Sequence, residues 1–232
     1  MSTSPFRPWA AILVAAGKST RLKSPLPKPF LKLDAKRTML DMCLQSFKKV
    51  KGLACVVVVT QKDYLEKAIG HLYRQGLAGI ACVGGKERED SVLRGLLVVP
   101  KGVQTVLVHD AARPFVSPEL IHSVLESAVL SGACVPGLPV KDTLKVVQKN
   151  TVAHTLDRDT VMAVQTPQGF RTELLKRAFL KVAARRSRFT DDAAIAEAAG
   201  FSVRLVEGDP LNFKVTTPDD LARARHLARG GR

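Results

Sequence analysis

The sequence predicts an α/β fold, a doubly wound and mostly parallel sheet with a β-arm that projects from it. One observation predicts the sheet. Short runs that are apolar on both faces alternate with helical segments through most of the 232 residues, as expected when helices cover both faces of a parallel sheet. A second observation predicts the arm, because the alternation breaks between Pro139 and Pro167. We therefore expect one domain over 1–232, with the arm at 139–160 within it.

In the first half of the chain, the strands are the most apolar segments. Ala10–Ala15 (AAILVA) predicts a first buried strand and Ala54–Thr60 (ACVVVVT) a second. Helical patterns fill the intervals between such runs. In chain order we expect a strand at 10–15, a helix at 38–50, a strand at 54–60, a helix at 63–75, a strand at 80–83, a helix at 90–98 and a strand at 105–109.

The second half opens with a helix whose start is clearly marked. Ser117 is a suitable N-cap, Pro118 takes the first helical position, and Glu119 places an acid in the first turn. This helix is expected to end at Gly132. After it we expect a strand at 133–138, hairpin strands at 141–147 and 151–156 joined by Lys149-Asn150, helices at 171–185 and 191–199, a strand at 202–206 and a helix from 218. The hairpin is either a lid or a dimerisation arm.

The composition limits the kinds of partner that the protein can have. A formal net charge of +15 points to anionic ligands without saying which. Nine Phe, two Tyr and one Trp are too few to suggest a set of stacking platforms for single-stranded nucleic acid. No apolar run approaches the length of about 18 residues that a membrane helix needs. We expect neither a nucleic-acid nor a membrane partner.

The four cysteines are widely spaced and form no Cys-x-x-Cys pair. Cys55 and Cys82 lie in apolar runs, which favours buried, reduced thiols and a cytoplasmic protein. Arg7 followed by the apolar run Trp9–Gly17 has some features of a short secretory signal. The same run is better explained as the first buried strand.

A small-residue loop follows the first strand and predicts an anion site. Its sequence is Ala15-Ala16-Gly17-Lys18-Ser19-Thr20-Arg21-Leu22, at the sheet edge where doubly wound folds bind nucleotides. Backbone N–H groups of such a loop can approach phosphates closely. The loop is not a Walker A motif, because Ile12 stands where the first glycine is required, and it lacks a G-x-G-x-x-G pattern.

Cations are concentrated around this loop. Residues 1–40 contain eight Lys or Arg and a single acid, Asp34. Lys28 lies between Pro27 and Pro29, and the two rings restrict the backbone on either side of it. A restricted backbone suits a cation that must be placed at one position.

Several separated motifs resemble those of the 2-C-methyl-D-erythritol 4-phosphate cytidylyltransferases, members of the Rossmann-like nucleotidyltransferases that serve the non-mevalonate isoprenoid pathway. The resemblance runs from about Ala10 to Leu221. One departure is Lys86, where many relatives carry an acidic or small residue. The motifs are Ala15-Ala16-Gly17 through Arg21, Pro27-Lys28, Gly84-Gly85-x-Glu87-Arg88-x-x-Ser91, His109-Asp110-Ala111-Ala112-Arg113-Pro114, Asp142-Thr143-x-Lys145, Asp157-Arg158, Gln165-Thr166-Pro167-Gln168, Thr190-Asp191-Asp192-Ala193 and Asn212-Phe213-Lys214-Val215-Thr216.

The resemblance implies a reaction and a set of site residues. CTP and the polyol phosphate give 4-diphosphocytidyl-2-C-methyl-D-erythritol and pyrophosphate, with Mg²⁺ as cofactor and Asp110 near the metal. Arg21 and Lys28 are expected to stabilise the transition state. Arg158 and Lys214 are expected to position the acceptor phosphate. The expected substrate-binding residues are Ala15, Ala16, Gly17, Gly85, Arg88, Ser91, Asp110, Arg113, Thr143, Thr166 and Thr190.

The resemblance also implies a homodimer, in which Thr143 and Arg158 on or near the arm serve the neighbouring subunit's site.

The residues fit this chemistry on physical grounds. A phosphate monoester has a second pKa of about 6, so the nucleophile is already ionised at neutral pH and needs no general base. Each unit-charge repulsion between two anions at about 4 Å is worth roughly 4 kcal/mol at an effective dielectric of 20. Positioned Lys, Arg and Mg²⁺ are the groups that reduce this repulsion.

Three alternatives stay open. A ribitol-5-phosphate cytidylyltransferase would use the same scaffold, but its family usually has Val where this sequence has Ala112. A sugar-1-phosphate nucleotidyltransferase would leave the Gly-Gly-x-Glu-Arg and Thr-Pro-Gln motifs unexplained. A basic nucleic-acid-binding protein would account for the net charge, but no recognised module of that kind is present.

Overall fold

The computed structural model describes residues 8–17, 22, 24, 26–183 and 189–230. An eight-stranded sheet forms its centre, in the order β10-β5-β9-β4-β1-β2-β3, with β8 paired to β5. The strands are β1 (Trp9–Val14), β2 (Leu53–Thr60), β3 (Gly79–Val83), β4 (Thr105–Asp110), β5 (Ala133–Pro139), β8 (Met162–Val164), β9 (Gln168–Arg171) and β10 (Arg204–Glu207).

The helices follow the predicted order. They are α1 (Met39–Lys48), α2 (Leu65–Arg74), α3 (Arg88–Leu97), α4 (Pro118–Ser131), α5 (Thr172–Val182), α6 (Asp192–Ala198) and α7 (Pro218–Ala228), with short 3-10 turns η2 (Lys28–Phe30), η3 (Lys62–Tyr64) and η4 (Arg158–Thr160). The predicted start of α4 is confirmed, since the side chain of Ser117 accepts a hydrogen bond from the N–H of Leu120.

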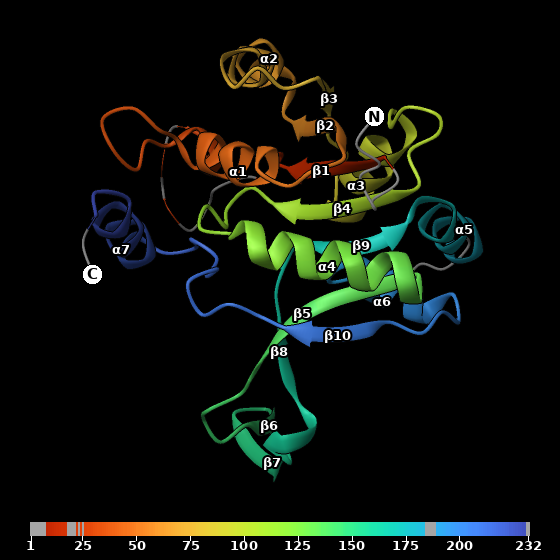
Figure 1. The fold of residues 1–232 in the computed structure, drawn as a ribbon. Helices are drawn as coiled ribbons and strands as arrows, with labels where there is room; N and C mark the ends of the chain where they lie inside the picture. Colours follow the sequence, from red (N-terminus) through yellow and green to blue (C-terminus); the bar gives the residue numbers. More distant parts are fainter. Residues whose placement is uncertain (1–7, 18–21, 23, 25, 184–188, 231–232) are drawn as a thin grey trace.

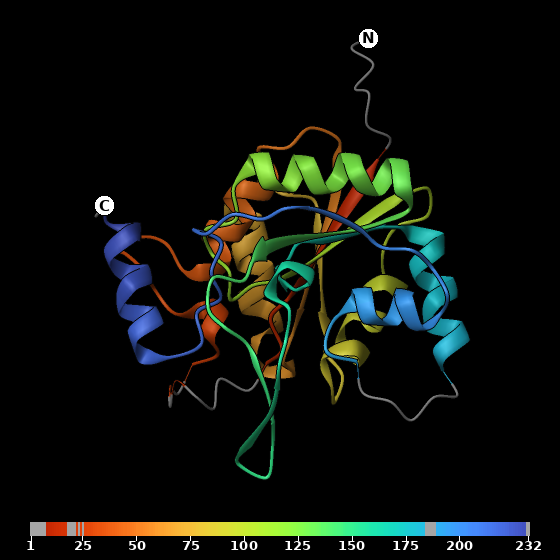
Figure 2. The same cartoon turned by 90° about the horizontal axis from the view of Figure 1, so that it is seen from below.

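Helices cover both faces of the sheet, as the apolar runs predict. Alternate side chains of β1 enter different cores: Ala11 and Leu13 pack with α1, α2 and α4, whereas Ala10 and Ile12 pack with α3, α5 and α6. Figure 2 shows α4 on one side of the sheet and α6 on the other. This two-sided burial explains why the strand carries no polar residue.

Two parallel strands end side by side at the edge that matters for function. β1 pairs with both β2 and β4, and Val14 lies opposite Asp110 in the β1–β4 register. The loop that begins at Ala15 therefore starts beside the carboxylate of Asp110. Neighbouring ends of parallel strands are the usual place for ligands in open α/β sheets.

Two antiparallel strands are not among the elements that the sequence predicts. β9 lies between β4 and β5 and is antiparallel to both, and β8 is antiparallel to β5. Gly169 makes this insertion possible, because a Cβ at that position would lie 2.8 Å from the Cβ of Ala128 on α4. The segment Gln168–Arg171 has no apolar run to mark it as a strand.

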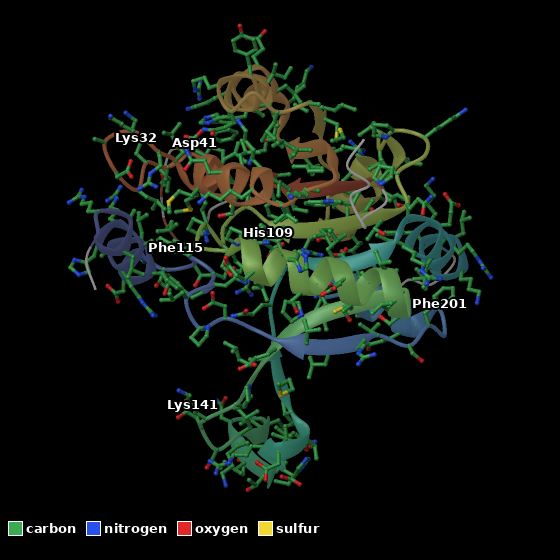
Figure 3. All side chains as sticks on the ribbon, viewed as in Figure 1. Lys32, Asp41, His109, Phe115, Lys141 and Phe201 are labelled. Atoms are coloured by element: carbon green, nitrogen blue, oxygen red, sulfur yellow. The ribbon has the colours of Figure 1, made fainter. Side chains whose placement is uncertain are left out.

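The predicted hairpin is present and forms a small sheet of its own. β6 (Lys145–Gln148) and β7 (Thr151–Thr155) pair antiparallel. Lys149 and Asn150 have φ values of 46° and 63°, the left-handed conformation that a two-residue hairpin turn of type I′ requires. The hairpin extends away from the central sheet, and Lys141 lies where it begins (Figures 1 and 3). Over the described ranges, every helix is too short or too polar to span a bilayer.

Candidate active site

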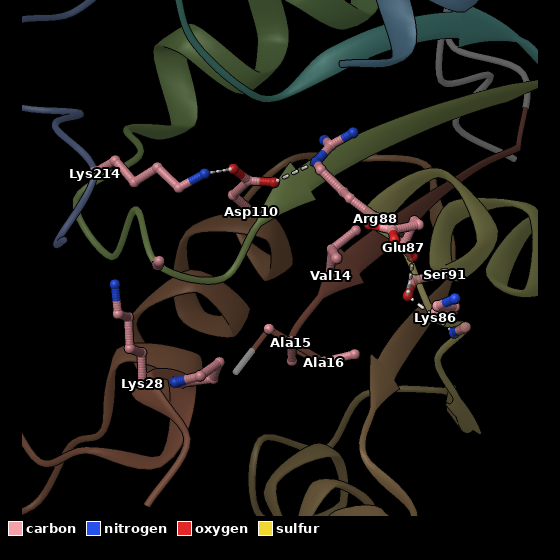
Figure 4. A pocket seen from close by; sticks show the side chains of 14 residues that line it. Val14, Ala15, Ala16, Lys28, Lys86, Glu87, Arg88, Ser91, Asp110 and Lys214 are labelled. Atoms are coloured by element: carbon pink, nitrogen blue, oxygen red, sulfur yellow. Dashed lines mark hydrogen bonds and ion pairs between the residues drawn. The ribbon is translucent and has the colours of Figure 1, made fainter. Parts of the chain in front are cut away.

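A cavity of about 530 Å³ opens at the edge where β1 and β4 end. Segments distant in the sequence meet here: the loop after β1, the turn η2, the start of α3, the end of β4 and the segment before α7 (Figure 4). Its lining combines small residues with Lys and Arg side chains and two acids. The lining residues are Val14, Ala15, Ala16, Gly17, Lys28, Pro29, Gly85, Lys86, Glu87, Arg88, Ser91, Asp110, Ala112 and Lys214.

One wall of the cavity is packed backbone. The N–H of Ala15 donates to Val59 O at 2.7 Å, which extends the β1–β2 pairing into the loop. A Cβ at Gly84 would lie 2.5 Å from the Cβ of Ala16, and a Cβ at Gly85 would lie 2.1 Å from the Cβ of Asp90. Side chains are therefore excluded from both glycine positions, and the strand–helix turn before α3 can approach the Ala15 loop closely.

Ser91 holds this turn in place. The N–H of Gly85 donates to Ser91 Oγ at 3.0 Å, and Ser91 Oγ donates to Glu87 O at 3.1 Å. Glu87 caps α3, and Asp90 completes a capping box with it. The predicted motif Gly85 to Ser91 is thus a cavity wall that its own hydrogen bonds support.

Opposite this wall, Asp110 lies between two cations. Arg88 Nε donates to Asp110 Oδ1 at 3.1 Å, and Lys214 Nζ donates to Asp110 Oδ2 at 2.5 Å (Figure 4). Burial opposes ionisation of Asp110, but the charges of Arg88 and Lys214 outweigh it and hold the pKa of this carboxyl well below its ordinary range. Asp110 is an anion at every physiological pH.

Arg88 makes a second charge contact behind the cavity. Its Nη2 lies 2.9 Å from Asp192 Oδ2, and the Asp192 side chain is fully buried. The angle at this contact is outside that of an aligned hydrogen bond. Burial raises the pKa of Asp192, and the Arg88 guanidinium opposes that rise.

A buried polar layer supports Asp110 from below. The N–H of Asp110 donates to Thr166 Oγ1 at 3.1 Å, and the same oxygen contacts His109 Nδ1 at 3.1 Å. Burial lowers the pKa of His109 to about 4, so its ring is neutral at pH 7. Arg113 Nη1 donates to Asn212 O at 2.8 Å, and Asn212 Nδ2 donates to Thr166 O at 2.8 Å. These contacts tie the end of β4 to the Lys214 segment.

Lys28 reaches the cavity from the turn η2. Its Nζ donates to Val215 O at 3.2 Å and to Thr216 O at 3.3 Å. Both carbonyls follow Lys214 in the chain, so Lys28 and Lys214 are held against the same segment. The proline-flanked turn thus places its cation as the sequence predicts.

Most of the predicted site residues meet at this cavity. Arg113 and Thr166 lie in the layer beneath it. The structure does not bring Thr143, Arg158 or Thr190 to the cavity: all three are exposed, and Arg158 Nη1 donates to Lys141 O within the arm. Arg21 lies outside the described residues. The predicted residues on the lining are Ala15, Ala16, Gly17, Lys28, Gly85, Arg88, Ser91, Asp110 and Lys214.

Two buried residues around the cavity have no role that the sequence predicts, namely Asp192, which contacts Arg88, and His109, which contacts Thr166. In the sequence, each of them stands within a longer motif that assigns it no role of its own. A signal for Asp192 exists, because it is an acid on the face of a short helix otherwise occupied by Ala193, Ile195 and Ala196, all buried.

The donor set also bears on the expected metal. No group of three or more His, Cys, Asp or Glu side chains that could hold a metal occurs in the described ranges. Asp110 is one ionised carboxylate facing the loop after β1. This fits Mg²⁺, which proteins often bind through one or two carboxylates together with substrate phosphates and water. It does not fit a metal held by protein ligands alone.

Comparisons with known proteins agree on one family. The family model for "IspD: 2-C-methyl-D-erythritol 4-phosphate cytidylyltransferase" matches residues 9–229. A cytidylyltransferase of that name from Caldanaerobacter subterraneus subsp. tengcongensis is 37% identical over 95% of this chain and 98% of its own. The crystal structure of that name from Thermus thermophilus is 38% identical, with a TM-score of 0.78 over 95% of this chain and 99% of that chain.

Another relative is longer than this chain. The "Bifunctional enzyme IspD/IspF" of Desulfotalea psychrophila is 39% identical over 95% of this chain, which spans 56% of that protein.

Proposed function

The chain belongs to the 2-C-methyl-D-erythritol 4-phosphate cytidylyltransferase family, and from this premise we propose how its cavity performs the family's reaction. The protein transfers a cytidylyl group from CTP to 2-C-methyl-D-erythritol 4-phosphate and releases pyrophosphate. One observation carries the assignment of the cavity: the small-residue loop after β1, Lys28, and the Asp110–Lys214 pair line the same space. A loop suited to phosphates, fixed cations and a carboxylate are thereby brought within one site.

We propose that the loop Ala15–Gly17 binds the triphosphate of CTP. Its small side chains let the backbone approach the phosphates. Lys28, held by two carbonyl oxygens, then faces the α-phosphate and stabilises the negative charge that develops when the acceptor attacks. We assign Arg21 to the same task from the family resemblance, with no geometry of its own.

Lys214 positions the acceptor phosphate in this proposal. Its side chain is 41% exposed while it contacts Asp110, so one side of it is available to an incoming anion. Because the acceptor phosphate is already ionised near neutral pH, the attack requires alignment and charge compensation but no base. Neutral His109 lies beneath Asp110 and does not face the cavity lining.

Mg²⁺ is the cofactor we propose. Asp110 would hold it, and the ion would neutralise charge on the triphosphate and on the β- and γ-phosphates, which leave as pyrophosphate. Lys214 and Arg88 already contact the two oxygens of Asp110, so this chain keeps the carboxylate ionised and oriented before substrate arrives.

We propose that the protein is a homodimer whose arms complete the sites. Thr143 and Arg158 are exposed and lie away from the cavity of their own chain. Val147 and Val152 of the arm are each 57% exposed, an apolar surface that a second copy could cover. Arg158 is then available to the acceptor phosphate in the partner's site. All four cysteines are free, which supports a cytoplasmic location.

The substrate assignment is tested by pairing nucleotides with acceptors. The purified protein is incubated with CTP, UTP or ATP and with methylerythritol phosphate or ribitol 5-phosphate, and pyrophosphate release is followed. We expect turnover with CTP and methylerythritol phosphate. Faster turnover with ribitol 5-phosphate would contradict the assignment.

Shared sites are tested by mixing two inactive variants. Lys28→Ala and Arg158→Ala dimers each lose most activity, because every site lacks one of the two cations. When subunits exchange, a mixed dimer has one site with both residues and one with neither. We expect the equimolar mixture to regain up to about a quarter of wild-type activity if exchange is random. A mixture that stays as inactive as its components, after exchange is verified, would contradict shared sites.

A further inference from the structure

We infer that Asp192 is a positioning residue for the cytidylyl transfer, which keeps the guanidinium of Arg88 on Asp110 and off the triphosphate. The inference rests on the proposed function of the cavity. It concerns a side chain that lies outside the cavity lining. Its effect passes entirely through Arg88.

The geometry of Arg88 is unusual for a residue on a phosphate site. Arg88 is the first residue of α3 and lines the cavity. Its Nε donates to Asp110 Oδ1 at 3.1 Å, and its Nη2 lies 2.9 Å from Asp192 Oδ2. One planar guanidinium therefore connects the start of α3, the end of β4 and the start of α6. A planar fork with several donors holds two carboxylates in fixed directions, whereas the donors of an ammonium lie on one freely rotating nitrogen and fix neither direction.

Asp192 has no other described function in the fold. Its side chain is fully buried, and neither carboxylate oxygen has an aligned hydrogen-bond donor among the described residues. The start of α6 is fixed by other groups: Gln168 Oε1 accepts from the N–H of Asp192 and of Ala193, both at 3.0 Å, and Asp191 caps the helix. The Asp192 carboxylate is thus not needed to begin the helix.

A buried ion pair of this kind adds little to stability on balance, because desolvation offsets the attraction between the charges. It does fix orientation. What it orients here is a cation on the wall of a site for a polyanion. A guanidinium with one carboxylate partner is drawn to bound phosphates, which present more charge than Asp110 does. The second carboxylate, that of Asp192 behind the cavity wall, keeps the Arg88 guanidinium in its position.

The consequence concerns Asp110 and Lys214. If Arg88 moved to the triphosphate, Asp110 would lose the contact to Oδ1 and keep only Lys214. Ground-state binding of CTP would gain a cation, and the arrangement around the reacting phosphates would be lost. An added ground-state contact of this type lowers KM without raising kcat.

The experiment is Asp192→Asn in the full chain, with CTP and methylerythritol phosphate as substrates. We expect kcat to fall by about tenfold or more while KM for CTP stays level or falls, the signature of a lost transition-state arrangement. Equal kcat in the variant would overturn the inference, because Asn matches the shape of the side chain without its charge. A rise in KM for CTP that accounts for most of the loss would also overturn it.

A double-mutant cycle separates positioning from a general effect on the fold. In an Arg88→Met background, Asp192 has no guanidinium to hold, so Asp192→Asn should change kcat by less than about twofold. If Asp192→Asn lowers kcat as much in that background as in wild type, Asp192 does not act through Arg88 and the inference fails.

Two further variants guard against a folding artefact. Asp41→Asn removes the charge of another buried acid, which is paired to His71 at 2.6 Å and lies outside the cavity lining, and should leave the ratio of kcat to KM for CTP unchanged. If Asp192→Asn does not fold, Arg88→Lys tests the same point, since Lys lacks the planar fork that orients the cation between the two carboxylates. It should show the same lowered kcat with no rise in KM, and a raised KM would count against the inference. Wild-type turnover with CTP tests the proposed function separately.

Discussion

Two cation-rich hollows lie on either side of the turn η2. Lys28 and Pro29 line the candidate catalytic cavity, whereas Phe30 and Leu31 line a second groove of about 1530 Å³ between α1, α2 and the end of α7. Lys32 and Asp41, which both line this groove, are labelled on the α1 side of the molecule in Figure 3. Both hollows are lined by more positive than negative side chains, but they differ in how these charges are held.

In the candidate catalytic cavity, cations are fixed by specific partners. Arg88 and Lys214 share Asp110, and Lys28 donates to two carbonyl oxygens. In the groove, the acids serve the protein itself, since Asp34 binds Arg37 and Asp41 binds His71. Five groove cations have no ion-pair partner among the described residues, namely Lys32, Lys36, Lys67, Arg74 and Arg229.

The difference indicates that the way in which the cations are held matters more for the proposed reaction than the net charge of the chain. Catalysis needs charge that is already oriented when the transition state forms, and the function we propose for the cavity depends on cations that buried acids and carbonyls hold in this way. Exposed cations mainly attract anions over a distance that salt limits. The groove has more cations than the cavity, but fewer of them are held by a specific partner.

The largest effect we expect comes from removing a fixed cation. Lys28→Ala should lower kcat by about 10²–10³-fold with a smaller change in either KM, because the lost charge acts mainly on the transition state. Steady-state kinetics of pyrophosphate release measures this. Lys32→Ala, on the groove, is the matched control and should change kcat less than about twofold. Comparable losses in the two variants would break the distinction between the hollows.

An intermediate effect should appear in the free energy of unfolding, through Asp41 of the groove. Burial opposes ionisation of Asp41, but contact with His71 outweighs it and lowers the pKa of Asp41 to about 2. A depressed folded-state pKa gives stability that is present above the unfolded value and lost as the pH falls. We expect the advantage of wild type over Asp41→Asn to shrink by about 2 kcal/mol from about pH 5 to about pH 2.

Urea denaturation across that pH range measures the advantage, and a constant difference would mean that Asp41 gains nothing from its partner.

The smallest effect should follow from neutralising exposed groove cations. Replacing Lys32, Lys36 and Arg74 by Gln should change the free energy of unfolding by less than about 0.5 kcal/mol each. The value of kcat/KM at low salt should fall by no more than about threefold, and the difference should vanish at high salt. Rates measured over a salt series test this. A salt-independent loss would show that these cations are positioned after all.

Much of the fold could be predicted because the strands that build it are apolar on both faces. β1, β2 and β4 are such segments, and the turn Lys149-Asn150 carries its own conformational signal. β9 could not be predicted this way, because a four-residue strand containing Gly169 is defined by what packs on it.

The site was predictable as a set of residue types but not as a set of pairs. The loop from Ala15 and the cation Lys28 follow from local sequence. The pairing of Lys214 with Asp110 spans 104 positions, and no local pattern specifies it. The role that we infer for Asp192 is harder still to predict, because it depends on the contact that the Arg88 guanidinium makes with it in the core.

The glycine pair before α3 has a bearing on drug resistance. A compound that rests against Gly84 and Gly85 would contact a surface that point mutation can hardly alter, because any added methyl group meets Ala16 or Asp90 at 2.5 Å or less. Escape from such a compound has to arise elsewhere on the rim, and Lys86, an exposed neighbour on the lining, is the first position to monitor.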